Sequence, residues 1–426
     1  MLAVVLFLGS AWPLCAQAGS TLAQLNGTVH DPANATVARA AITLRELNTN
    51  QVHLTTSNGL GLYFAVDLPP GQYELMVQAA GFSKRVLSGI VLRVGQVATI
   101  NVGLSIATHE EQIVVTSETP LLEPSRTETS QVIEAGQISS LPISGRLFTD
   151  FVLLTPGVST GRTSLQSTNT EFEATRVSFG GMRDLSNEVT VDGADTINTV
   201  TGSQRATPPQ EAVSEFRVVN NSFGADYGRA LGGIVNITTK SGGNVMHGSV
   251  YEYFQSGATD AASLLSAPQF QTLRQNQFGA TFGAPIVRDK TFYFANYEGQ
   301  RRAESPTYPG YLLGDLGVIN AAKAALGLSP ENLNILRTRD HDNGIVRVDQ
   351  VVTNNRLAVR YDVEDGRDSN LLVGHTMDGG GVGAPSAAHN LDSRDEVLAG
   401  TWTGNPRPKL VNAALVQWAR RSYSFP

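Results

Sequence analysis

The first residues constrain the chain most strongly, because they determine the cellular compartment in which it folds. An apolar run from Leu2 to Cys15 is followed by Ala16-Gln17-Ala18, which is the pattern of a secretory signal peptide with a cleavage site after Ala18. The run is shorter than the roughly 20 apolar residues that a membrane-spanning helix needs. We therefore expect residues 1–18 to be a signal peptide and the mature protein to be exported.

The lack of cysteine limits what can hold an exported fold together. Cleavage after Ala18 removes Cys15, the only cysteine, so core burial and sheet pairing must stabilise the mature chain. No later stretch reads as a transmembrane helix. This leaves a secreted, a periplasmic or an outer-membrane barrel protein, since a closed barrel also satisfies backbone groups in lipid.

The composition fits a mainly β protein with many turns. Charged residues make up 16% of the chain and glycine occurs 42 times. The formal net charge is -7, and this acidic balance argues against nucleic acid as a partner.

Short alternating strands separated by turn residues run from about Leu25 to Ala107. The clearest stretches are LNGTVHD, ARAAITLREL, GLYFAVDL, GQYELMVQAAG and GQVATINVGLSI. This spacing predicts a small β-sandwich over residues 19–107. The stretch NGTVHDPANATVARAAITL and the signature PPGQYELMVQAAGF resemble the carboxypeptidase regulatory-like domain, which implies a prealbumin-like sandwich of the carbohydrate-binding-like class. Sugar binding and a purely structural or docking role both remain open.

Residues 127–240 combine one helical patch with further short strands. The patch places Phe148, Phe151, Val152 and Leu154 roughly on one face, and Asp192-Gly193 is a hairpin turn signal. The stretch PPQEAVSEFRVVNNSFGADYGRALGGIVNITTKSGGN resembles the plug domain of TonB-dependent outer-membrane receptors. Together with LPISGRLFTDFVLLTPGV upstream, it is similar to the Oar-like branch. The resemblance implies a mixed α/β plug domain that follows the sandwich.

After Lys240 the chain contains segments of about ten residues, the length of a tilted transmembrane strand. In LAVRYDV, apolar and polar residues alternate, with Leu357 and Val359 on one face and Arg360 and Asp362 on the other. A half-exposed soluble sheet has the same alternation. However, LRQNQFGATFGAPIVRDKTFYFANYEGQR resembles the first barrel strands of Oar-like receptors. We therefore expect a transmembrane antiparallel β-barrel over residues 241–426, with 302–342 as an external loop.

The length of this last segment predicts a partial barrel. Transporters of this type close about 22 strands around a plugged lumen, and at about 10 residues each the strands alone need roughly 220 residues. The segment 241–426 is shorter than that. We therefore expect an incomplete barrel and a fragment of a longer receptor, or a truncated gene.

Three motifs that resemble catalytic or metal sites have simpler explanations. Gly157-Val158-Ser159-Thr160-Gly161 matches the G-x-S-x-G elbow, but no helix is predicted after it, so a flexible loop is expected. The histidines are scattered and are expected in solvated loops. Asp192 and Asp195 form a possible carboxylate pair, although the turn at Asp192 favours a structural role. We predict no catalytic residues, no metal site, no cofactor and no enzymatic activity.

The segment 108–126 links the sandwich to the plug and contains EEQIVVTSETP. TonB-dependent receptors carry an extended TonB box ahead of the plug, which the periplasmic coupling protein captures by strand addition. The β-branched run has the strand propensity for this role, and Pro120 stops it from extending. The alternative is a final strand of the sandwich. We favour a TonB box made of Gln112, Ile113, Val114, Val115 and Thr116.

The sequence thus predicts an exported receptor in the outer membrane of a Gram-negative bacterium. Its expected partners are a TonB-type coupling protein in the periplasm, outer-membrane lipid and an extracellular ligand. The candidate ligand classes are a siderophore, an oligosaccharide, a peptide and a protein, and the sequence does not choose among them. Loops 159–176 and 195–210 are expected to face this ligand. The alternative is an outer-membrane-anchored adhesion or binding protein without energised transport.

Overall fold

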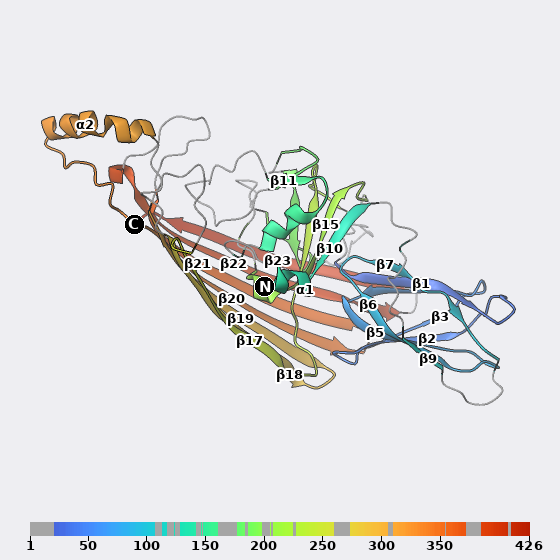
Figure 1. Cartoon of the computed structure of the whole chain (residues 1–426). Coiled ribbons are helices and arrows are strands. Elements are labelled where there is room, and N and C mark those ends of the chain that lie inside the picture. Colours follow the sequence, from blue (N-terminus) through green and yellow to red (C-terminus); the bar gives the residue numbers. More distant parts are fainter. Residues whose placement is uncertain are drawn as a thin grey trace, which may run out of the picture.

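The computed structural model has three parts, which we call the sandwich, the central region and the wall (Figure 1). The sandwich comprises strands within residues 21–116, the central region spans 128–240 and the wall spans 247–424. The described residues are 21–106, 113–116, 123, 128–141, 146, 148–160, 177–183, 186–197, 205, 208–224, 227–259, 273–305, 310–353, 355–371, 385–407 and 410–426.

Two sheets form the sandwich and enclose its core. One has the strand order β4-β1-β7, with β8 also paired with β1, and the other has the order β3-β2-β5-β6-β9. Side chains that alternate inward along these strands build the core, in which Leu25, Tyr63 and Tyr73 are fully buried. The strands are β1 (Ala23–His30), β2 (Ala41–Glu46), β3 (Val52–Thr56), β4 (Leu62–Leu68), β5 (Gly71–Gln78), β6 (Arg85–Leu92), β7 (Val97–Thr99), β8 (Val102–Gly103) and β9 (Ile113–Thr116).

The central region is a five-stranded sheet with short helical elements, as expected for a mixed α/β fold. Its strand order is β10-β15-β16-β13-β14, and β11 and β12 form a separate pair. The helical elements are α1 (Ala135–Ser140) and the 3-10 turns Phe148–Leu154 and Gln210–Ala212. The strands are β10 (Thr129–Glu134), β11 (Val158–Thr160), β12 (Val177–Phe179), β13 (Glu188–Val191), β14 (Ala194–Asp195), β15 (Val213–Asn221) and β16 (Ile234–Thr239).

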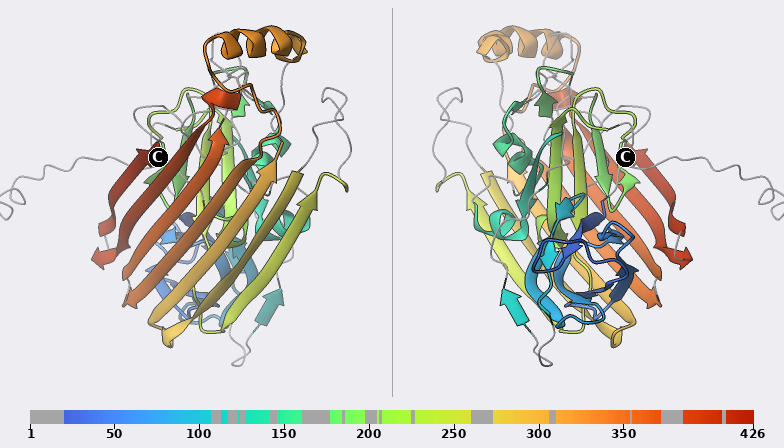
Figure 2. Two further views of the ribbon diagram at one scale, coloured as in Figure 1. Left: turned by 90° about the vertical axis from the view of Figure 1, so that its left-hand side faces the viewer. Right: turned by 90° about the vertical axis from the view of Figure 1, so that its right-hand side faces the viewer.

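The wall is a curved antiparallel sheet in which each strand pairs with the next one along the chain. Figure 2 shows it wrapping around one side of the central region. Strands β17 and β23 are its two edges. The strands are β17 (His247–Ser256), β18 (Leu273–Val287), β19 (Thr291–Glu304), β20 (Arg337–Val352), β21 (Asn355–Leu371), β22 (His389–Arg407) and β23 (Leu410–Ser424).

The two faces of the wall differ in polarity, as in a membrane barrel with an apolar outside and a polar inside. The outer face exposes large apolar side chains, including Phe278, Phe282, Leu357, Val359, Leu398 and Trp402. The inner face buries polar groups against the central region, including Gln275, Gln277, Arg347, Arg360, Glu364 and Asp395. The expected alternation around Arg360 is therefore confirmed.

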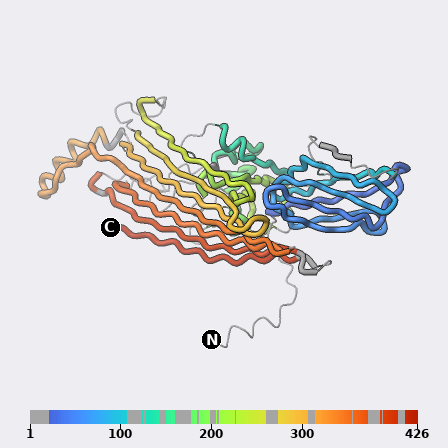
Figure 3. The backbone as a smooth tube through the Cα atoms, turned by 90° about the horizontal axis from the view of Figure 1, so that it is seen from below, coloured from blue at the N-terminus to red at the C-terminus, as the bar shows by residue number. Residues whose placement is uncertain are grey.

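The sandwich lies at the end of the wall where the strand connections are short, as Figure 3 shows from below. The backbone N–H of Asn244 donates to the carbonyl of Asn48 across 2.8 Å, and Asn50 donates to Asp289 across 2.8 Å. Helix α2 (Gly310–Ala325) lies at the opposite end, between β19 and β20 (Figure 1).

Several strands extend beyond the sequence prediction. Strands β3 and β6 lie outside the five stretches predicted for the sandwich, and β20 begins at Arg337, inside the expected loop 302–342. In the patch 148–154, Phe151 and Val152 are buried, but Leu154 is exposed, so its place on the common face was wrong. Within the described part of the chain, the helices are too short or too polar to span a membrane.

Close backbone approach in the sandwich makes Gly27 a sensitive position. A Cβ atom there would lie 1.8 Å from the carbonyl oxygen of Ile100, and no flexible side chain is available to move aside. We expect Gly27→Ala to lower the stability of the sandwich by about 1–3 kcal/mol. Hydrogen exchange of the β1 and β7 amides in the full chain measures this loss. Gly59→Ala is the control, because its new Cβ meets no atom within 4 Å. Equal protection in the two variants would contradict the prediction.

Candidate functional site

A network of buried ion pairs joins the central region to the inner face of the wall. Its centre is Asp192, in the two-residue turn between β13 and β14. Asp192 and Gly193 have φ angles of 50° and 83°, as a tight I′ hairpin requires, so the predicted turn is confirmed. This turn directs the carboxylate of Asp192 at the wall, where it pairs with Arg347 of β20 at 3.2 Å and with Arg360 of β21.

Further carboxylates of the wall complete this network. Arg347 also pairs with Asp349 at 3.0 Å, and Arg356 pairs with Asp349 at 2.9 Å. Arg360 pairs with Asp362 at 2.8 Å. The network thus joins three arginines to three aspartates, including Asp192, and their charges balance. Balanced pairing of this kind is what allows charges to remain buried.

Thr239 of β16 holds Asp192 from within the central region. Its backbone N–H and its hydroxyl donate to the carboxylate across 2.9 and 2.7 Å. Burial alone would raise the pKa of Asp192, but Arg347, Arg360 and the two bonds from Thr239 outweigh it and hold the pKa below its usual range. Asp192 is therefore ionised at neutral pH and anchors the hairpin to the wall.

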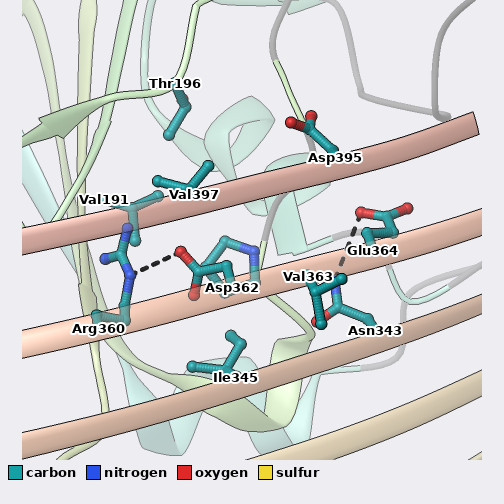
Figure 4. Close-up of a pocket in the computed structure, with 11 residues that line it drawn as sticks. Val191, Thr196, Asn343, Ile345, Arg360, Asp362, Val363, Glu364, Asp395 and Val397 are labelled. Atoms are coloured by element: carbon teal, nitrogen blue, oxygen red, sulfur yellow. Dashed lines mark hydrogen bonds and ion pairs between the residues drawn. The ribbon is translucent and has the colours of Figure 1, made fainter. Parts of the chain in front are cut away.

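A second group of contacts continues along the same interface. Asp395 of β22 pairs with Arg421 of β23 at 2.6 Å and with Arg205 of the central region at 3.7 Å. Gln417 donates to the carbonyl of Asp195 across 2.7 Å. Between this group and Arg360 lies a cavity of about 20 Å³ (Figure 4), a size that admits water rather than a ligand.

A third contact lies at the β17 edge and is carried by Arg146. Its guanidinium pairs with Glu211 at 2.7 Å and stacks 3.6 Å from the ring centre of Tyr253. The neighbouring Tyr251 donates its hydroxyl to Glu298 of β19 across 2.8 Å. Arg146 is therefore held within the central region by Glu211 and contacts the wall through the ring of Tyr253.

A separate polar junction joins the sandwich to the central region. The backbone N–H of Val94, in the turn after β6, donates to Glu215 of β15 across 2.5 Å. Arg217 of β15 donates to the carbonyl of Gly95 and pairs with Glu128. Burial raises the pKa of Glu215 to about 7, although the N–H of Val94 and the charge of Arg93 oppose the rise.

The residues expected to form a TonB box lie mostly in β9. Ile113–Thr116 pairs in parallel with β6 of the sandwich, from Arg85 opposite Ile113 to Ser88 opposite Thr116. This is the pairing that the alternative interpretation expected. It does not test whether a coupling protein binds the segment. Gln112 and Ala18 lie outside the described residues.

The motifs set aside in the sequence have structural positions. Ser159 lies in β11, opposite Ser178 of β12, so it occupies neither a nucleophile elbow nor the flexible loop that was expected. His53 and His341 lie on strands β3 and β20, which corrects the expectation of solvated loop histidines. Asp195 pairs with Arg229 and not with Asp192. Among the described residues, no cluster of three or more His, Cys, Asp or Glu side chains is placed to hold a metal ion.

Sequence reasoning missed the wall arginines and Arg146 as partners of the central region. Arg347 and Arg360 lie on the neighbouring strands β20 and β21, each at a position that faces the inner side of the wall. The pairing register of these two strands places them opposite each other. The signal within the sequence was the pair of inward positions Arg360 and Asp362. It indicates a polar face but does not identify Asp192 as the group that this face meets.

The balance of charge around Asp192 predicts the effect of neutralising it. Asp192→Asn leaves the two guanidinium groups of Arg347 and Arg360 with one negative charge fewer, and we expect a loss of about 3–5 kcal/mol. Hydrogen exchange of the Val191 and Ala194 amides reports this loss as easier opening of the hairpin. The control is Asp365→Asn, which breaks the exposed pair with Arg394 and should change stability by less than about 1 kcal/mol. Similar losses in both variants would rule out the anchoring role.

The raised pKa of Glu215 predicts that the junction with the sandwich weakens as pH rises. The carboxyl is protonated in both the folded and the unfolded chain below about pH 4.5, and its stabilising contribution is lost as pH rises through about 7. We expect the free energy of opening at the Val94 amide to fall by about 2–3 kcal/mol between pH 5 and 8, measured by hydrogen exchange corrected for intrinsic rates. Glu215→Gln should remove most of this fall, whereas Glu74→Gln, at a surface pair with Arg45, should retain it. An unchanged slope in Glu215→Gln would refute the assignment.

Comparisons with known proteins match two parts of this architecture. Residues 24–105 match the family model of the carboxypeptidase regulatory-like domain, and residues 238–312 match that of an outer membrane beta barrel domain. The TonB-dependent transporter Oar of Myxococcus xanthus is 25% identical over 287 residues, which are 64% of this chain and 26% of that protein. The chain thus spans about a quarter of the length of this curated relative.

A solved structure shares the fold. The siderophore receptor PirA from Acinetobacter baumannii has a TM-score of 0.50 and 19% identity, over 70% of this chain and 41% of that chain. These similarities confirm the resemblance to Oar-like TonB-dependent receptors that the sequence motifs predicted. They also confirm a mainly β chain with a carboxypeptidase regulatory-like sandwich and a barrel wall, located in the outer membrane of a Gram-negative bacterium.

Proposed function

We propose that this chain is part of a TonB-dependent receptor that takes up a ligand across the outer membrane. In this proposal the central region is the plug, residues 127–240, and the wall is one arc of a larger barrel. The observation that carries the proposal is the ion-pair interface, in which Asp192 enters the polar inner face of a sheet whose outer face is apolar.

The orientation of the wall supports this proposal. Outer-membrane barrels have short periplasmic turns and longer extracellular loops. The sandwich, the segment Ile113–Thr116 and the short turn at Asp289 lie at one end of the wall, and α2 lies at the other. The proposed TonB box is therefore on the periplasmic side, where a coupling protein reaches it, while α2 belongs to an external loop.

The interface also suggests how force acts on the plug. Ligand binds from outside, the coupling protein pulls on the box from the periplasm, and the plug rearranges to open a path. The pairs of Asp192 with Arg347 and Arg360, the pair of Arg205 with Asp395 and the stacking of Arg146 on Tyr253 hold the plug closed until then. The pairs of Arg360 and Asp395 can separate if water enters the small cavity that both residues line and replaces the lost partner.

The proposed ligand is an extracellular siderophore, oligosaccharide or peptide. A siderophore is one candidate because PirA is a siderophore receptor, and an oligosaccharide or a peptide are the others. The surfaces proposed to meet the ligand are the plug segments 159–176 and 195–210 together with the external loop that contains α2. The parts of these segments that the structure describes include Asp195–Ile197 and Arg205.

The rival function is an outer-membrane-anchored adhesion or binding protein without energised transport. The pairing of β9 with β6 favours it in one respect, because an adhesin can keep this segment permanently within the sandwich. Binding of a coupling protein separates the two functions, since only the receptor requires it.

The test is capture of the full chain, in detergent, by the periplasmic domain of TonB from the same organism. We expect binding by the parent and a loss of at least about tenfold in Val114→Pro, because proline removes a backbone donor and resists strand pairing. Val114→Thr is the matched control: it keeps a β-branched residue of similar shape and should bind like the parent. A folded parent that does not bind would favour the adhesion protein.

A further inference from the structure

The sandwich presents a strand edge that the chain itself occupies. The sheet order β3-β2-β5-β6-β9 makes β6 the last strand contributed by residues 21–106, and β9 adds to its outer side. Four residue pairs define the parallel register, from Arg85–Ile113 to Ser88–Thr116. Strand addition of this kind is how a sheet edge binds an extended peptide, through main-chain hydrogen bonds. The β6 edge therefore has the properties of a peptide-binding site.

We propose that the β6 edge is an intramolecular binding site that withholds Ile113–Thr116 from the coupling protein, so that this partner must displace β9 to capture it. The inference rests on the proposed function, because it assumes that the segment is a TonB box. It goes further by assigning the sandwich a role, as a competitor for the box.

When β9 is paired with β6, few of its backbone N–H and C=O groups are free to pair with a second sheet. In a strand of four residues, alternate residues direct their N–H and C=O groups to opposite sides. Those facing β6 are engaged in the ladder, which leaves the groups of about two residues for a strand on the outer side. A released segment provides every residue of EEQIVVTSETP for pairing in a register that the partner chooses. The coupling protein is therefore expected to bind the released segment more tightly than the docked one.

The direction of force supports displacement as well. After β9 the chain leads to Glu128, which pairs with Arg217 of β15. While β9 remains paired with β6, a pull on Ile113–Thr116 acts on the sandwich sheet. Once β9 leaves β6, the same pull passes along residues 117–127 to Glu128 and to β10 of the plug. Release of β9 from β6 thus gives the pull a direct path to the plug.

The pairing of β9 with β6 is reversible because it is short, and it forms again readily because the linker to β9 is short. Net contributions of about 1 kcal/mol per hydrogen bond and a parallel ladder, which is slightly weaker than an antiparallel one, make four residue pairs a weak association. The tether compensates, since only positions 104–112 separate β8 from β9, and a short tether gives a high effective concentration. The coupling protein therefore competes with the β6 edge, which binds β9 weakly but is held close to it by the linker.

The test is a reversible disulfide between β6 and β9 in the full chain. Ser88 and Thr116 are register partners, and neighbouring strands lie about 4.8 Å apart, within the range that a disulfide spans. The mature chain contains no other cysteine, because Cys15 is removed with the expected signal peptide. Ser88→Cys/Thr116→Cys is compared in its oxidised and reduced states for binding of the periplasmic TonB domain.

We expect oxidation to weaken binding at least about tenfold and reduction to restore the affinity of the unmodified chain. The reduced state controls for folding, and the two single variants control for effects of oxidant. A synthetic peptide of residues 110–120 should bind more tightly than the full chain, because no β6 edge competes for it.

The outcomes separate this inference from the function on which it rests. Equal affinity in the oxidised and reduced states, together with binding by the peptide, would overturn the competition and leave the receptor function standing. Binding by neither the peptide nor any form of the chain would overturn both.

Discussion

The burial of Asp192 against two wall arginines is the interaction on which the placement of the central region depends. The inner face of the wall carries charges that are excluded from solvent, and such charges persist only where each one meets a partner. Asp192 adds a second carboxylate to Arg347 and Arg360, which already pair with Asp349 and Asp362 of the wall, and it makes the number of negative charges equal to the number of positive ones. The hairpin turn that presents it, with two residues in the left-handed region, therefore defines the position of the central sheet against the wall.

A continuous series of contacts links this anchor to the sandwich. Thr239 of β16 holds Asp192, β16 pairs with β15, and β15 carries Glu215, which binds the turn after β6. Strand β6 in turn pairs with β9. The proposed box and the buried ion pairs thus lie at opposite ends of a hydrogen-bonded sequence of strands.

The sequence predicted the classes of structure better than the contacts between them. Alternation in LYFAVDL and LAVRYDV revealed strands with one buried face, and Asp192-Gly193 revealed its hairpin. Strand β20 was missed because its first half, RTRDHDNG, is polar on both faces where it extends past the apolar band, and Arg301 pairs there with Asp342. The partners of Asp192 were not predictable, because they depend on the docking of two sheets that are distant in the sequence.

The position of β9 shows why propensity alone did not decide between a box and a sandwich strand. Ile113–Thr116 has the β-branched residues that both roles require, so the same four residues suit either sheet edge. What differs is the length of pairing that each partner offers. A segment that is held by four residue pairs in one sheet and can form a longer ladder in another is suited to exchange between them. Low stability in the docked state is then a condition for function, since a tightly held β9 would never reach a partner.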